Sequence, residues 1–239
     1  MGRILIVIPA YNEEQTIVDV LERARQALPG ADLIVINDGS TDGTQEALCR
    51  EDVPTATHIC NLGYGRTLQT AIKYARRLRY DALVKIDADG QHNPEHLSQL
   101  IDELRTGDWD LLIGSRYVGR GRYDGVPLGR KTGMLLFSFL VRLITGQRIY
   151  DTTSGMKVFR SSVFEPLVQW HFVDFHAEAI VYLSLLGYSV GEFPIVAAER
   201  VHGTSMYAPI SHITYPLKTC ILIFIGVFQA ALSRGKKRQ

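Results

Sequence analysis

Short apolar runs alternate with helical patterns along the first half of the chain, and no other feature constrains the fold as strongly. The runs recur roughly every 25 to 30 residues, which is the spacing of β-α-β units and predicts a parallel sheet. We expect strands over residues 3–8, 32–37, 56–60, 82–87 and 110–115. Asn12 and Gln15 have the spacing of a capping box, so Asn12 is predicted to cap the first helix. The pattern predicts a doubly wound, mostly parallel α/β sheet.

The alternation ends after Arg116, where a polar, glycine-rich loop over residues 117–129 begins. Beyond this loop we expect helices over residues 135–144, 177–186 and 213–232 and one strand over residues 190–196. The first and last of these helices are strongly apolar. The chain is therefore predicted to end in apolar helices that follow the sheet.

Composition argues against an intrinsically disordered chain and against a nucleic-acid-binding protein. The 239 residues include 46% hydrophobic residues, 26 basic and 25 acidic side chains. Such a chain buries a core, and its near-neutral charge argues against a nucleic-acid partner. The three cysteines have neither paired nor zinc-binding spacing, which favours a reducing compartment. The apolar run at the N-terminus is about six residues long, too short for a signal peptide, so we expect the bulk of the chain in the cytosol.

Polar clusters follow three of the predicted strands, at the edge where open parallel sheets bind ligands. They occupy residues 9–13, 38–40 and 87–89. A single aspartate at a strand end is usually a turn former, and we interpret Asp42 in that way. Three clusters at one edge instead favour a binding site. The dinucleotide and P-loop glycine motifs are absent from the sequence, which argues against Rossmann dehydrogenases and P-loop nucleotidases.

Asp87 and Asp89 form an Asp-x-Asp pair directly after the fourth predicted strand. Mg²⁺ binds proteins through one or two carboxylates and completes its coordination with substrate phosphates and water. A solvated loop is the alternative interpretation of such a pair. The apolar strand before it and Gly90 after it favour a site for Mg²⁺ or Mn²⁺.

Seven motifs, in this order along the chain, resemble those of the inverting family-two glycosyltransferases, in particular the dolichyl- or polyprenyl-phosphate sugar synthases. The motifs are VIPAYNEE, VINDGSTDGT, NLGYGRTLQTAIKYA, VKIDADGQHNPE, LLIGSRYV, DTTSGMKVFR and EFPIVAAERVHGTSMY. The resemblance covers about residues 3–207. The resemblance implies a GT-A fold, a UDP- or GDP-linked sugar donor and a polyprenyl phosphate acceptor.

The same resemblance assigns donor-site residues by position. The pocket for the base and ribose would contain Pro9, Tyr11, Glu13 and Asp38. The metal and diphosphate site would contain Asp87, Ala88, Asp89 and Gln91, with Asp87, Asp89 and Gln91 as the metal ligands. Arg116 and Arg200 match arginines beside the donor or lipid phosphates, a role that suits guanidinium groups. The alternatives are a surface ion pair for Arg116 and a helix or strand end for Arg200.

Asp174 and Glu178 lie where related enzymes keep acidic residues near the acceptor. With a hydroxyl acceptor, Asp174 would act as the general base. A lipid phosphate is already largely ionised at neutral pH, so these residues would then only orient the acceptor or the sugar. An equally weighted alternative is that both residues cap the helix that begins near Ala177.

One expected charge is missing from the last motif. Related sequences end this motif in Gly-x-Ser-Lys, whereas Met206 stands at the lysine position here. The nucleotide base therefore stays open, and Lys157 is a candidate to replace the missing charge. His92, His96 and His176 lack the spacing of metal ligands, and we interpret them as surface or turn residues.

A polyprenyl phosphate enzyme must reach a bilayer, and two apolar segments are candidates. Residues 135–144 and 220–232 each fall short of the roughly 18 to 20 apolar residues that span a membrane. Pro216 and Lys218 precede the second segment and a basic tail over residues 234–238 follows it. We expect this segment to lie in the interface, or to dock on a small membrane partner protein, with a single span as the minority alternative. Ordinary core helices are the other alternative, above all for residues 135–144.

The preferred hypothesis is a metal-dependent inverting glycosyltransferase at the cytoplasmic face of a membrane. Residues 1–210 would form the catalytic domain and residues 211–239 the membrane-associating segment. The residues expected to take part in catalysis are Asp89, Arg116, Asp174 and Glu178. One alternative is transfer to a hydroxyl of a glycan or protein, and another is a non-catalytic module that binds nucleotide sugars.

Overall fold

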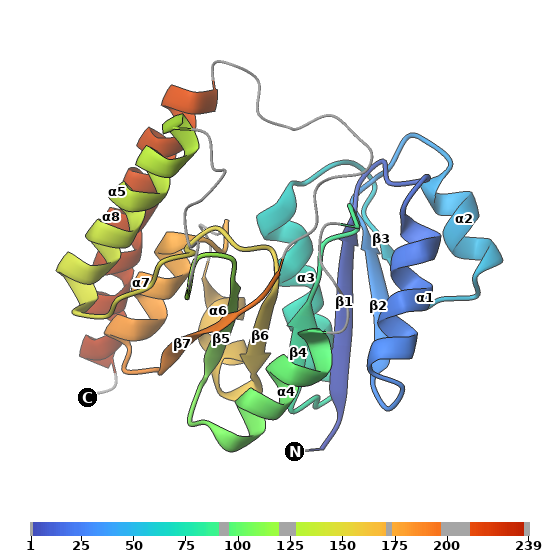
Figure 1. Ribbon diagram of the computed structural model, residues 1–239, viewed down its shortest axis with the longest axis horizontal. Coiled ribbons are helices and arrows are strands. Elements are labelled where there is room, and N and C mark those ends of the chain that lie inside the picture. Colours follow the sequence, from blue (N-terminus) through green and yellow to red (C-terminus); the bar gives the residue numbers. More distant parts are fainter. Residues whose placement is uncertain (1, 91–95, 120–127, 171–173, 197–210, 237–239) are drawn as a thin grey trace.

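The computed structural model describes residues 2–90, 96–119, 128–170, 174–196 and 211–236. Its strands are β1 (Ile4–Ala10), β2 (Asp32–Asn37), β3 (Thr55–Thr57), β4 (Ala82–Lys85), β5 (Leu111–Ser115), β6 (Lys157–Arg160) and β7 (Val190–Pro194). They form a seven-stranded sheet in the order β3-β2-β1-β4-β6-β5-β7, in which β6 alone runs antiparallel to its neighbours (Figure 1). The predicted doubly wound, mostly parallel sheet is confirmed.

Helices cover both faces of this sheet. They are α1 (Ile17–Ala27), α2 (Thr44–Arg50), α3 (Tyr64–Arg77), α4 (His96–Thr106), α5 (Leu128–Thr145), α6 (Phe164–Gln169), α7 (Ala177–Leu185) and α8 (Ser211–Lys236). Alternate residues of β1 enter separate cores: Leu5 and Val7 pack with α3, while Ile6 and Ile8 pack with α1 and α4. A strand buried on both faces reads as a continuous apolar run, which explains why the sequence predicted β1 so clearly.

The antiparallel strand β6 is the main element that the sequence did not predict. It lies between β4 and β5, in the middle of the sheet. Two of its four residues are Lys157 and Arg160, so it lacks the apolar pattern of a buried strand. The structure accommodates them by hydrogen bonds from Lys157 Nζ to the carbonyl of Ser154 and from Arg160 Nε to the carbonyl of Trp109.

Asn12 does not cap α1, so this prediction was wrong. Thr16 precedes the helix and makes no side-chain capping bond. Asn12 instead has a φ of 56°, in the left-handed region that asparagine tolerates. Its backbone N–H donates to Ser40 Oγ at 3.0 Å, and its Oδ1 accepts from the backbone N–H of Thr41 at 2.8 Å. Asn12 therefore ties the loop after β1 to the loop after β2.

Three helices gather beyond the β7 edge of the sheet: α5, α7 and α8 (Figure 1). Helix α8 packs along α7 and buries Ile223 and Ala230 in the larger core. A Cβ at Gly226 would lie 3.4 Å from the carbonyl oxygen of Glu178, so the two backbones approach closely there. Helix α8 is thus packed against the globular fold along part of its length.

Helix α8 extends the predicted helix over residues 213–232 by two residues at its start and four at its end, and it includes Pro216 and Lys218 as expected. Within the described residues, Pro216–Ser233 is the one 18-residue helical window with the length and composition of a membrane span. Its mean hydropathy is 1.7, and 22% of it is buried inside the fold.

Candidate active site at the carboxyl ends of the strands

The three polar clusters predicted from the sequence lie at one edge of the sheet. Strand β1 pairs in parallel with β2 and with β4, so the loops that follow these strands leave the sheet on the same side. Ala10 is the register partner of Asn37, and Val7 is the register partner of Lys85. The topology therefore brings together the loops that contain Tyr11, Asp38 and Asp87.

Asp38 is buried and orders the loop beside it. Its carboxylate accepts hydrogen bonds from the backbone N–H groups of Leu62 at 3.0 Å and Gly63 at 2.9 Å, and Nδ1 of His58 lies 2.6 Å from it. Burial alone would raise the pKa of Asp38, but these hydrogen bonds outweigh it and lower the pKa. Asp38 thus holds the loop over residues 58–63 against the strand end.

The loop after β1 presents the other predicted residues of the base and ribose pocket. Pro9 lies within β1, and the Tyr11 side chain is exposed. Glu13 accepts a hydrogen bond from Thr16 Oγ1 at 2.9 Å, and its backbone N–H donates to Thr44 Oγ1 at 2.9 Å. The exposed ring of Tyr11 is the surface of this loop that could stack on a base.

Asp42 behaves as the sequence predicted for a turn former. Its carboxylate accepts from the N–H and the hydroxyl of Thr44, at 3.1 and 2.6 Å, where α2 begins. It also accepts from the backbone N–H of Glu14 at 3.2 Å. Asp42 therefore joins the first two loops of the site.

Asp87 and Asp89 flank buried Ala88 at the end of β4, and both aspartates are partly exposed. Gly90 follows with a φ of +72°, a conformation that L side chains rarely adopt. Gln91 lies outside the described residues. Among the described residues no group of three or more His, Cys, Asp or Glu side chains could enclose a metal. Two partly exposed carboxylates fit a cation that takes its other ligands from phosphates and water.

Two buried lysines lie under this turn: Lys85, which the sequence did not place at the site, and Lys157, the candidate to replace the missing charge. Lys85 is fully buried, and its ammonium group pairs with Asp87 Oδ1. Burial would lower the pKa of Lys85, but the charge of Asp87 outweighs burial and raises the pKa. Lys157 is also buried, and burial together with Lys85 lowers its pKa to about 7. Lys157 therefore lies beneath the site surface, and its role as a replacement for the lysine missing from the last motif stays a prediction.

Arg116 forms a bidentate ion pair with fully buried Asp151, a partner that the sequence did not predict. Nε and Nη2 of Arg116 donate to Asp151 at 2.8 and 2.9 Å. Burial acts against both charges, yet the pairing outweighs it, raising the pKa of Arg116 and lowering that of Asp151. The surface ion pair considered for Arg116 is instead an internal one. Arg200 lies outside the described residues.

Glu178 and Asp174 have different surroundings. Glu178 is fully buried, and its Oε1 accepts from the backbone N–H groups of Asp174 and His176, both at 3.0 Å. Burial raises the pKa of Glu178. Glu178 therefore binds the residues that precede α7, whereas His176 at the N-cap position makes no side-chain capping hydrogen bond. Asp174 instead extends to α8, where its Oδ2 lies 2.5 Å from Lys218 Nζ.

His176 packs its ring parallel to that of Tyr64, with the ring centroids 5.4 Å apart. Burial and the charges of Lys157 and Lys85 lower its pKa well below the ordinary value. His176 lies in a bend, as expected, but its ring is packed against Tyr64 instead of facing solvent. We call residues 174–176 the acceptor loop, after the role that the sequence predicts for Asp174.

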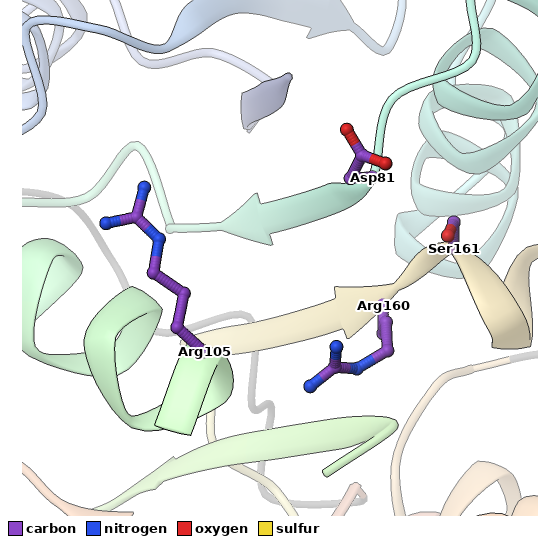
Figure 2. Close-up of a pocket in the computed structure, with 4 residues that line it drawn as sticks. All are labelled: Asp81, Arg105, Arg160 and Ser161. Carbon is purple, nitrogen blue, oxygen red and sulfur yellow. The ribbon is translucent and has the colours of Figure 1, made fainter. Parts of the chain in front are cut away.

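A cavity at the opposite edge of the sheet is a poor candidate for the site. It is lined by Asp81, Arg105, Arg160 and Ser161 (Figure 2). Arg160 donates to the carbonyls of Trp109 at 2.8 Å, Leu104 at 2.5 Å and Gly107 at 3.2 Å. Its guanidinium group therefore stabilises the end of α4.

Comparisons with known proteins identify the family of the chain. Residues 5–168 match the family model described as glycosyl transferase family 2. The chain is 32% identical to undecaprenyl-phosphate mannosyltransferase from Micrococcus luteus, over 85% of this chain and 86% of that protein. It is 34% identical to polyprenol monophosphomannose synthase from Mycolicibacterium smegmatis, over 85% of this chain and 80% of that protein.

The fold is also shared with a solved structure. Glucosyl-3-phosphoglycerate synthase from Mycobacterium tuberculosis, in complex with Mn²⁺, UDP-glucose and phosphoglyceric acid, superposes with a TM-score of 0.68. The match covers 94% of this chain and 79% of that one at 20% sequence identity, which supports a GT-A fold. The chain belongs to glycosyl transferase family 2, in the branch of the polyprenyl-phosphate sugar synthases.

Proposed function

We propose that this glycosyltransferase moves a sugar from a UDP- or GDP-linked donor to a polyprenyl phosphate at the cytoplasmic face of a membrane. The contact that carries the proposal joins Lys218 of the apolar helix α8 to Asp174 of the acceptor loop. It connects the apolar helix that would lie in lipid with the residue that the sequence predicts near the acceptor. The lipid phosphate substrates named for two relatives support the same acceptor class.

On the donor side, Asp87 and Asp89 would hold Mg²⁺ or Mn²⁺. Such an ion would neutralise the negative charge that develops on the departing nucleoside diphosphate. Lys85 pairs with Asp87 from below and fixes the direction of that carboxylate. Tyr11, Glu13 and Asp38 would line the base and ribose pocket together with Pro9. Ala88, Gln91 and Arg200 would complete the donor site.

On the acceptor side, a phosphate oxygen would attack the anomeric carbon from the face opposite the diphosphate. The new bond joins this oxygen to the anomeric carbon while the bond from that carbon to the diphosphate oxygen breaks. The phosphate is already ionised near neutral pH, so the attack needs little help from a base. The pairing of Asp174 with Lys218 fits this acceptor better than a hydroxyl, which would require Asp174 to accept a proton.

Exposed apolar side chains on two contacting helices support a membrane surface as the place of reaction. Helix α5 exposes Leu135, Leu136, Phe139 and Leu143, and α8 exposes Leu217, Ile221, Phe224, Phe228 and Leu232. The two helices lie side by side (Figure 1). Exposed apolar side chains gathered on neighbouring helices are typical of membrane or protein contacts. We place these side chains in the interface, with the basic residues that end the sequence near anionic headgroups.

The test is a transfer assay with the full chain, a panel of UDP- and GDP-sugars, and Mg²⁺ or Mn²⁺. Polyprenyl phosphate in vesicles is compared with soluble glycans as acceptor. We expect sugar to enter the lipid fraction with one class of donor and to depend on the metal. Transfer to soluble glycans alone would contradict the proposal and favour a hydroxyl acceptor. Donor binding without turnover on any acceptor would also contradict it and would indicate a binding module.

A further inference from the structure

The ion pair between Lys218 and Asp174 joins α8 to the acceptor loop. The Nζ–Oδ2 distance is 2.5 Å, and the side chains of Lys218 and Asp174 are 60% and 27% exposed. Lys218 is the only charged residue between Pro216 and Ser233. A lone cation on an otherwise apolar helix therefore meets the loop that the proposed function assigns to the acceptor.

The two partners of this pair differ in how firmly the fold holds them. The backbone of Asp174 is fixed by its hydrogen bond to buried Glu178, and the next residue, Phe175, packs edge-on against Phe159 inside the core. Lys218 carries its ammonium group on a flexible four-carbon stem in a largely exposed position. The lysine is thus the partner that can turn toward another anion while the carboxylate stays in place.

A short series of contacts leads from this pair to the metal site proposed above. Glu178 Oε1 binds the N–H groups of both Asp174 and His176. The His176 ring stacks on Tyr64, and the ammonium group of Lys85, which pairs with Asp87, lies 4.6 Å from the centre of the Tyr64 ring. This series of contacts connects Lys218 to the turn that contains Asp87.

Lys218 also lies beside the apolar side chains that would face lipid. Leu217 precedes it, and Ile221, three residues later on the same helix, is exposed as well. A prenyl chain that follows these side chains would leave its phosphate near the ammonium group of Lys218. An exposed ion pair contributes little to stability, so exchanging the carboxylate of Asp174 for a phosphate costs the fold little.

We propose that Lys218 binds the phosphate of the prenyl acceptor, and that Asp174 holds the lysine until the phosphate replaces it. This assignment rests on the proposed function and names a residue for its acceptor site. The same ammonium group could instead meet the headgroup of any anionic lipid, so the test separates the two sources of phosphate.

The test compares Lys218→Gln, Lys218→Arg and Asp174→Asn in the full chain, with farnesyl phosphate as a short acceptor. We expect Lys218→Gln to raise the KM for farnesyl phosphate about tenfold or more and to leave the KM for the nucleotide sugar unchanged. Lys218→Arg keeps the charge and should stay within about threefold of the native KM. Lys73→Gln, which removes an exposed lysine on α3, is the matched control and should change nothing.

Asp174→Asn distinguishes phosphate binding from a merely structural ion pair. If Asp174 binds Lys218 only in the absence of the phosphate, removing the carboxylate frees the lysine. The KM for farnesyl phosphate should then fall or stay unchanged. If the pair is structural, Asp174→Asn and Lys218→Gln should both raise this KM by similar factors, which would overturn the proposal. A native KM in Lys218→Gln would overturn it too.

Two further measurements distinguish prenyl phosphate from anionic headgroups, and the role of Lys218 from the proposed function as a whole. Lys218→Gln should bind phosphatidylglycerol vesicles without prenyl phosphate as well as the native chain does; weakened binding would assign the lysine to bulk headgroups and overturn the proposal. If the native chain transfers sugar to no prenyl phosphate, the proposed function fails. If the native chain transfers sugar and Lys218→Gln keeps the native acceptor KM, only the assignment of Lys218 fails.

Discussion

Lys85 and Lys157 are register partners across β4 and β6, and both side chains are buried in the middle of the sheet. Two like charges at opposed positions of an antiparallel pair repel each other. The pair is tolerated because Asp87 compensates Lys85, while burial and repulsion shift Lys157 toward its neutral form. The turn proposed to bind metal and diphosphate therefore rests on one firmly charged lysine and one that titrates close to neutrality.

This arrangement predicts a pH dependence of stability that replacement of Lys157 should remove. The pKa of Lys157 is about 7 in the folded chain, against an ordinary value of 10.5. Between these values the unfolded chain holds a proton that the folded chain lacks, so raising the pH stabilises the fold. The contribution is up to about 1.4 kcal/mol per pH unit. Urea unfolding at pH 7, 8 and 9 should show a steeper rise for the native chain than for Lys157→Met, and parallel profiles would contradict this prediction.

Asp151→Asn should destabilise the fold strongly. Asp151 is fully buried and binds Arg116 through both carboxylate oxygens, so the substitution leaves a buried guanidinium group without its counter-charge. We expect a loss of about 3 to 5 kcal/mol in the free energy of unfolding. Asp102→Asn, which breaks an exposed ion pair with Arg105 on α4, should stay within about 0.5 kcal/mol. Equal effects of the two variants in denaturant titrations would argue against the internal ion pair.

Asp89→Asn should nearly abolish sugar transfer without changing the fold. Asp89 lies in a partly exposed turn, where the loss of one charge removes a proposed metal ligand but no packing. Initial rates are measured with the donor and Mn²⁺ both below saturation, and circular dichroism checks the fold. Asp102→Asn is again the control, and it should retain native rates. Undiminished transfer by Asp89→Asn would rule out its role as a metal ligand.

Replacing Phe224 and Phe228 by serine should weaken binding to anionic vesicles. Their exposed fractions are 73% and 67%, so the substitutions leave the core intact. Each phenylalanine that enters lipid contributes on the order of 1.5 to 3 kcal/mol. Ile59→Ser is the control, because Ile59 is 104% exposed on a loop far along the chain from α8. Co-sedimentation should show a loss for the double variant alone, and equal binding by all three proteins would contradict the membrane assignment.

Carbonate washing then distinguishes an interfacial helix from a span. Extraction of at least part of the protein is expected if α8 lies in the interface. Full retention would show that Pro216–Ser233 crosses the bilayer. Point substitutions are preferable to removing residues 211–239, because Ile223 and Ala230 of α8 complete the core and truncation would expose it.

The sequence predicted those features that depend only on whether a side chain is buried or exposed. Ile17, Val20, Leu21 and Ala24 have the spacing of one helix face, and all four are buried in α1. The loops after β1, β2 and β4 were expected at one edge because the β-α-β rhythm predicts parallel strands, whose carboxyl ends lie on the same side. Their positions are confirmed by the parallel pairing of the three strands.

The remaining features depend on contacts between residues far apart in the chain. Arg116 finds Asp151 after a separation of 35 residues, and Asp174 finds Lys218 on the last helix. Strand β6 was missed because Lys157 and Arg160 interrupt its apolar pattern. Both are accommodated only by hydrogen bonds to the carbonyls of Ser154 and Trp109. No local pattern marks such partners, so the site residues were easier to identify than their electrostatic environment.

Glu178 contacts both α8 and the acceptor loop, because Gly226 of α8 lies close to its backbone. The carbonyl oxygen of Glu178 faces Gly226 on α8, and its carboxylate holds the N–H groups of Asp174 and His176. One residue therefore couples the helix that would sit in lipid to the loop that would receive the acceptor. A change in the tilt of α8, imposed by bilayer thickness or curvature, would be transmitted to the acceptor loop through Glu178. In this protein the membrane would then help to align the site as well as supply the substrate.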